Sequence, residues 1–155
     1  RLSKEPQPKT SYPALAARFP QHPATPAEVR KAVIEIRDSK LPDPAKVPSA
    51  GSFFKNPVVS RETFGRICAA EGGEDAVPHY PAPDGVKIPA AWMIDRCGWK
   101  GRTMGNAAVW HLQPLVIVNP DRKATPADVL ALERAIIESV RERFGVTLTP
   151  EVEHI

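Results

Sequence analysis

Residues 49–59 read Ser-Ala-Gly-Ser-Phe-Phe-Lys-Asn-Pro-Val-Val. The aromatic and β-branched residues in this stretch predict a β-strand over 52–59. Because a proline cannot donate a hydrogen bond to a neighbouring strand, Pro57 indicates that this strand lies at a sheet edge or contains a bulge.

The same stretch carries the densest local signal for a ligand site in the sequence. Since side chains alternate along a strand, Ser52, Phe54 and Asn56 would share one face, and Lys55 would lie on the other. Gly51, which has no Cβ, would let the backbone approach a ligand beside the Ser52 hydroxyl. The alternative is a plain loop-to-strand junction with a capping serine and a solvated lysine. The spacing excludes a P-loop, because no Gly-Lys-Ser/Thr follows the glycine.

Helices and further strands are predicted on both sides of this stretch. Thr-Pro-Ala-acid begins two segments and is typical of a capped helix start, and glycines follow several periodic apolar runs. Residues 1–24 read as irregular, with Leu2 as the end of a strand that began upstream. The fold class is α+β, with one small, mixed, mostly antiparallel sheet packed with helices. The predicted helices are 26–38, 61–71, 90–96 and 126–144, and the further strands are 86–88, 107–110, 115–119 and 146–152.

Composition describes an ordinary globular chain of 155 residues, 42% apolar and 25% charged. The net charge of +3 is spread over interspersed acids and bases, and only 6% of residues are aromatic, so no nucleic-acid-binding stripe is indicated. Apolar runs are strand-sized, which argues against a membrane helix, and the polar N-terminus does not resemble a signal peptide. Two isolated cysteines fit a reducing cytoplasm, and neither they nor the four histidines show metal-ligand spacing.

Three other polar residues could contribute to a site, although each has a simpler explanation. Glu151 follows a proline near the end of the chain, where a lone glutamate is usually solvated. Lys40 follows a helix, where a cation also complements the helix dipole. Gln113 precedes an apolar strand and could be a surface residue. From the residues alone, the prediction is a small α+β domain with a polar ligand site around Ser52.

Five stretches together resemble the C-terminal portion of the UDP-N-acetylenolpyruvoylglucosamine reductase family, and they occur in family order from about residue 10 to the end. The most specific is Ala-Gly-Ser-Phe-Phe-Lys-Asn-Pro. One departure is Pro48-Ser49, where the family usually has Gly-Asn. The stretches are 40–44, 50–57, 91–95 running into 100–101, 105–109 and 150–152.

This resemblance implies an activity and two catalytic residues. In the family, NADPH reduces FAD, and the flavin passes a hydride to the enolpyruvyl group of UDP-N-acetylglucosamine enolpyruvate in peptidoglycan synthesis. Ser52 matches the serine that protonates the resulting carbanion. Glu151 matches a glutamate that supports the developing negative charge together with an arginine outside this chain. A non-catalytic nucleotide-sugar-binding module and a purely structural domain are the alternatives.

The resemblance also implies substrate contacts and a domain plan. Residues 1–40 would be the tail of an FAD-binding domain, 41–149 the substrate-binding domain, and 150–155 a segment returning toward the first FAD-binding domain. The remaining FAD-binding part of the enzyme would be the chain's partner, so the chain alone is expected to hold no FAD and to be inactive. The expected substrate-binding residues are Tyr12 (on the mobile loop of the longer-loop type), Lys40, Asn56, Tyr80, Lys87 and Gln113.

Overall fold

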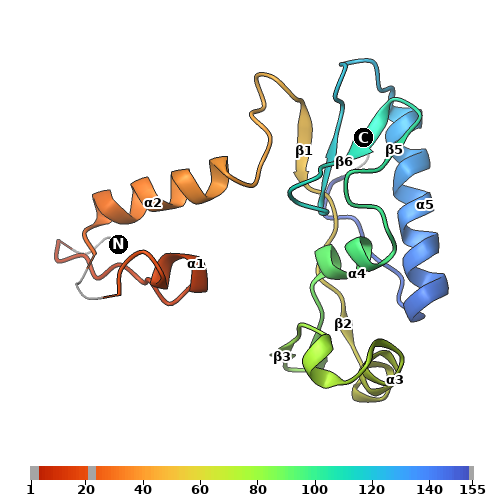
Figure 1. The fold of residues 1–155 in the computed structure, drawn as a ribbon, viewed down its shortest axis with the longest axis horizontal. Helices are drawn as coiled ribbons and strands as arrows, with labels where there is room; N and C mark the ends of the chain where they lie inside the picture. The colour runs from red at the N-terminus through yellow and green to blue at the C-terminus, as the bar shows by residue number, and fades with distance from the viewer. Residues whose placement is uncertain (1–3, 21–23, 154–155) are drawn as a thin grey trace. The chain divides into compact units, whose positions relative to one another are not determined.

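The computed structural model describes residues 4–20 and 24–153. The chain divides into two compact units, Arg1–Leu41 and Pro42–Ile155. Figure 1 shows the elements of both units in chain order. The strand end predicted at Leu2 lies outside the described residues.

The first unit contains two helices, α1 (Pro13–Ala16) and α2 (Pro26–Asp38). The predicted start of α2 is confirmed, because the Thr25 hydroxyl accepts from the Glu28 amide while the Glu28 carboxylate accepts from the Thr25 amide at 2.8 Å. The prediction that residues 1–24 are wholly irregular is wrong at α1. There, Pro13 occupies the first helical position, where a missing amide hydrogen costs nothing.

The second unit contains two antiparallel sheets rather than the single sheet expected. The first has the strand order β1-β7-β6-β5, and the second has the order β2-β4-β3. The α+β class is confirmed. The strands are β1 (Ser49–Ser52), β2 (Val58–Val59), β3 (Tyr80–Ala82), β4 (Gly85–Lys87), β5 (Thr103–Met104), β6 (Ala107–Val109) and β7 (Val116–Val118).

The helices of this unit begin and end close to the positions that the sequence predicts. They are α3 (Arg61–Glu71), α4 (Ala90–Arg96) and α5 (Pro126–Phe144), with a 3₁₀ turn at Glu74–Ala76. Both α3 and α5 end at a glycine with a left-handed backbone. Figure 1 shows α5 running alongside β5 and β6, and α3 beside β2. One apolar core joins the helices to the sheets, and its fully buried members include Phe54, Ile88, Met93, Ile94, Leu132, Ile136 and Leu148.

The prediction of one continuous strand over 52–59 is wrong. Phe53 donates its amide to the Leu115 carbonyl, whereas its own carbonyl accepts from the Glu151 amide, both at 2.8 Å. In a regular strand the two groups of one residue point to the same side, so the backbone changes partners here. Phe53 and Phe54 are both 2% exposed, which also breaks the expected alternation. The chain therefore crosses from the first sheet to the second between β1 and β2.

The strand predicted over 146–152 is reduced to a single bridge, in which Phe54 pairs with Pro150. Val146 and Leu148 are buried, so the apolar pattern has a packing role without a strand. Pro150 lacks the amide hydrogen that a longer ladder would need.

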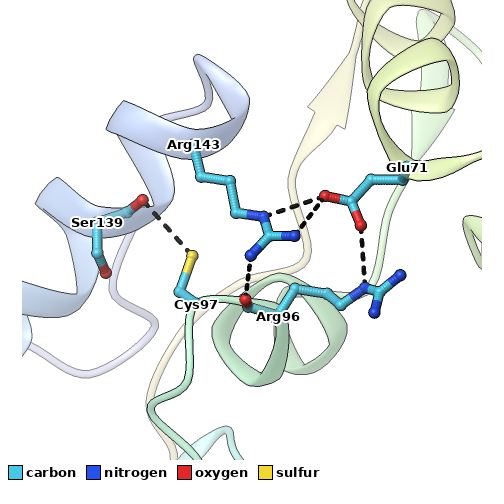
Figure 2. A network of polar contacts seen from close by, with 5 residues as sticks. All are labelled: Glu71, Arg96, Cys97, Ser139 and Arg143. Atoms are coloured by element: carbon cyan, nitrogen blue, oxygen red, sulfur yellow. Dashed lines mark hydrogen bonds and ion pairs between the residues drawn. The ribbon is translucent and has the colours of Figure 1, made fainter.

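Three helices of the second unit are joined by a cluster of charged side chains, which Figure 2 shows. The Glu71 carboxylate on α3 is 6% exposed and accepts two hydrogen bonds from Arg143 of α5, at 3.0 and 2.8 Å. Arg96 of α4 reaches its other oxygen at 3.0 Å, and Arg143 also donates to the Arg96 carbonyl. This cluster fixes the C-terminal end of α4.

Candidate functional site

A β-bulge precedes Ser52. Three steps along β1 oppose two along β7, since Ser49 pairs with Val118 and Ser52 with Val116. Gly51 lies inside the bulge with a φ of 77°, a conformation that glycine adopts without strain. Ser52 is exposed at the end of β1. A bulge of this kind bends its strand and redirects the next side chain, and here that side chain is the predicted proton donor.

Glu151 lies next to this bulge, although it is far from Ser52 in the sequence. Its amide donates to the carbonyl of Phe53, the residue that follows Ser52. A second backbone bond, from Lys55 to Thr149 at 2.9 Å, fixes the same pair of segments. Both Ser52 and Glu151 are exposed. The structure therefore brings the backbones of the two expected catalytic positions together.

Asn56 lies on the crossing segment, residues 52–58, which joins the first sheet to the second. Its side chain already has one partner. Its Oδ1 accepts from the amide of Ala90, the first residue of α4, at 2.9 Å. This bond sets which atom of the amide faces Ala90, and it leaves both NH₂ donors and one Oδ1 lone pair for another molecule. No local pattern predicts this contact, since 34 residues separate the two positions.

Tyr80 and Lys87 are direct cross-strand partners in the second sheet. Tyr80 is 59% exposed, and Lys87 is also exposed. The loop Pro83-Asp84 joins their strands into a tight hairpin. Turn residues at 83–85 could have predicted this pairing, but the predicted strands begin only at 86 in this region and β3 was missed.

The other three expected substrate contacts belong to neither the crossing segment nor the β3–β4 hairpin. Tyr12 and Lys40 belong to the first unit, where both are exposed. Tyr12 precedes α1, and its carbonyl accepts from two helix amides at 2.8 Å. The Gln113 side chain turns back onto its own loop and accepts from the Leu115 amide at 3.5 Å. Gln113 is therefore partly used in shaping the turn before β7.

The groups present restrict the chemistry of the site. Burial raises the pKa of the Cys68 and Cys97 thiols above their ordinary value, which argues against a cysteine nucleophile. Residues 4–20 and 24–153 contain no group of three or more metal-ligating side chains. Over the same residues, no helix has the length and apolar character that crossing a membrane requires.

A cavity of about 270 Å³ lies beside the bulge. Its lining is almost entirely apolar and comes from β1 and its two flanking residues, from the end of β7 and from the start of α5. The lining residues are Pro48, Ser49, Ala50, Phe53, Ile117, Val118, Asn119 and Val129.

Comparison with known proteins identifies the family of this chain. Residues 43–155 match the family model described as "UDP-N-acetylenolpyruvoylglucosamine reductase, C-terminal domain". A UDP-N-acetylenolpyruvoylglucosamine reductase of Burkholderia multivorans is 56% identical over 129 residues, which are 83% of this chain and 36% of that protein. Its namesake from Porphyromonas gingivalis is 46% identical over 158 residues, covering 100% of this chain and 46% of that protein.

The chain thus spans less than half the length of these relatives. Its match to the family model covers the whole second unit except its first residue, including the bulge, the crossing segment and both sheets. The chain belongs to the UDP-N-acetylenolpyruvoylglucosamine reductase family, and it carries the C-terminal domain of that family.

Proposed function

We propose that this chain is the substrate-binding and proton-donating part of a cytoplasmic UDP-N-acetylenolpyruvoylglucosamine reductase, which forms UDP-N-acetylmuramate for peptidoglycan. The observation that carries the proposal is the backbone hydrogen bond from Glu151 to Phe53, because it brings the backbone of the residue with the expected carboxyl group next to the neighbour of the expected serine. In this proposal, residues 1–40 complete an FAD-binding domain, 41–149 bind substrate and 150–155 return toward the first FAD-binding domain.

The crossing segment, residues 52–58, supports an extended ligand. Ser52 begins it, beside the backbone bond between Phe53 and Glu151, Asn56 lies in the middle, and Lys87 pairs with Val58 at the other end. Seven residues of extended chain span roughly 20 Å. We assign the enolpyruvyl group to the serine end and the nucleotide to the lysine end. Tyr12, Lys40 and Gln113 would complete the contacts.

The proton step follows from the chemistry of the enolpyruvyl group. Once a hydride has formed a bond to C3, the electron pair of the former double bond resides on C2 and in the adjacent carboxylate. The Ser52 hydroxyl gives its proton to C2, forming the new C–H bond and leaving a serine alkoxide that solvent reprotonates. A serine is a weak acid, so this transfer requires the strongly basic C2 centre within about 3 Å of the hydroxyl.

Glu151 would act on the charge that spreads into the substrate carboxylate. A carboxyl group donates a hydrogen bond only in its protonated form. The hydrogen bond then stabilises the enolate-like transition state more than the ground state.

The hydride itself has to come from outside this chain. FAD and NADPH are the expected cofactors, yet the cavity beside the bulge is smaller than the ~300–1,000 Å³ of ordinary ligand pockets and almost wholly apolar. These residues do not fit a flavin dinucleotide. We therefore assign both cofactors to the rest of the polypeptide, and we assign only substrate binding and protonation to this chain.

The test is Ser52→Ala in the complete reductase polypeptide, followed by stopped-flow absorbance of the flavin. Reduction by NADPH should keep its normal rate, whereas reoxidation by the enolpyruvyl substrate should fall by a factor of about 100 or more, the usual size of a lost acid-base group. Ser49→Ala, on the same strand, is the matched control and should leave both rates unchanged. Equal loss of both half-reactions in Ser52→Ala would indicate a packing role and contradict the proposal.

A further inference from the structure

Three side chains form a row across the second sheet. Lys87 on the central strand β4 pairs with Val58 on β2 and with Tyr80 on β3. Residues directly opposite one another in an antiparallel sheet project from the same face, so the three lie side by side. Val58 is 47% exposed and Tyr80 is 59% exposed.

This row combines an aliphatic group, a cation and an aromatic ring. A single exposed valine needs no explanation. Here, however, two large apolar side chains flank the same lysine, whose methylene stem can lie between them while the ammonium group projects beyond. Such a surface suits a ligand with a ring at one point and an anionic group at the next.

The row is held rigidly at the β2 side. A Cβ added to Gly85 would lie 2.2 Å from the Val59 carbonyl oxygen, so β4 approaches β2 as closely as a glycine allows. The Ile88 amide also donates to the Pro57 carbonyl at 3.0 Å, immediately before Val58. Because both neighbours of Val58 are fixed, its methyl groups are in place before a ligand arrives, which lowers the entropy cost of binding.

We propose that Val58 is a specificity-determining contact for the nucleoside part of a uridine diphosphate ligand. The uridine lies against Val58 and Tyr80, while the phosphate next to the ribose meets the Lys87 ammonium group. This inference rests on the proposed function and adds a residue to it. Val58 has no polar atom in its side chain, so its contribution is the apolar surface that the ligand covers.

The experiment measures UDP binding by calorimetry in the complete reductase polypeptide and compares three variants. Val58→Thr keeps the β-branched shape and replaces one methyl group by a hydroxyl. It should raise Kd about fourfold or more, the factor expected for one methyl group that loses its burial. Val58→Ile should keep the wild-type Kd within about twofold. Met104→Gln, at an exposed apolar position on β5 of the first sheet, is the matched control and should not change Kd.

The outcomes separate this inference from the proposed function. Wild-type protein that fails to bind UDP and UDP-N-acetylglucosamine would overturn both. Wild-type binding with an unchanged Kd for Val58→Thr would overturn only the role of Val58. An equal loss of affinity in Val58→Thr and Val58→Ile would also overturn it, because the apolar surface is retained in the second variant.

Discussion

At the scale of single residues, Asn56 has an observed structural contact and a proposed binding role. Its Oδ1 accepts from the Ala90 amide, so its NH₂ donors are left for the proposed ligand. Donors suit an anion such as the diphosphate of the proposed substrate.

Asn56→Asp tests this orientation. The aspartate can still accept from the Ala90 amide, so the melting temperature should change little, whereas its negative charge replaces the donors that face the ligand. We expect the Kd for UDP-N-acetylglucosamine to rise at least tenfold by calorimetry, since like charges then oppose each other. Asn56→Ala serves as the comparison and should lower the melting temperature as well. Unchanged affinity in Asn56→Asp would remove Asn56 from the site.

At the scale of elements, the sequence predicts helices better than strands. The capping boxes at Thr25 and Thr125 and the glycine after Phe144 are local signals, and all three are confirmed. Strand 52–59 was predicted wrongly because its pairing depends on distant partners, namely the Leu115 and Glu151 backbones. Local propensity cannot reveal such a change of partner.

The candidate site likewise contains features that the sequence predicts and features that it does not. The Ala-Gly-Ser motif located Ser52 from sequence, and the resemblance supplied Glu151, Tyr80 and Lys87. Neither source predicted the bulge at Gly51 or the contact between Asn56 and Ala90, because both arise from the register of long-range pairing.

The start of α5 provides a prediction for pH. Hydrogen bonds from the Thr125 backbone and hydroxyl hold the pKa of Asp128 below its ordinary value. A depressed folded-state pKa contributes stability above the unfolded-state pKa of about 3.9, and that stability is lost as pH falls through the folded-state value. In thermal melts between pH 6 and pH 2.5, the melting temperature of the wild type should therefore fall more steeply below pH 4 than that of Asp128→Asn. Parallel curves for the two proteins would contradict this assignment.

The contact between β4 and β2 provides a prediction for stability. Gly85→Ala places a Cβ against the Val59 carbonyl and requires an alanine at a φ of 153°. We expect a loss of about 2–4 kcal/mol in the free energy of unfolding by chemical denaturation, the range of steric and backbone strain in a packed region. Gly65→Ala, in an open helical position, is the control and should be neutral or stabilising. Equal stability of Gly85→Ala and wild type would show that β2 can move away.

At the scale of the whole molecule, this chain spans less than half the length of the relatives it matches. Its described residues supply two sheets joined by the crossing segment. The proposed flavin chemistry then depends on the remaining part of the polypeptide.

The purified 155-residue chain should accordingly contain no flavin and should show no NADPH oxidation with the enolpyruvyl substrate. An absorbance spectrum from 300 to 550 nm measures the first expectation directly. A flavin band near one equivalent per chain would contradict the assignment of FAD to the rest of the polypeptide. The complete polypeptide, prepared in parallel, is the positive control.

The crossing segment also limits how this domain can be rearranged by engineering. Residues 52–58 begin in the first sheet and end in the second, and between the sheets they hydrogen-bond to the backbone of residues 149–151. Neither sheet can therefore be exchanged without the other. A chimera that imports the β3–β4 hairpin from a relative must import Ser52 and residues 149–151 with it. Recombination between family members should therefore tolerate junctions in the loop before β1 and reject junctions between the two sheets.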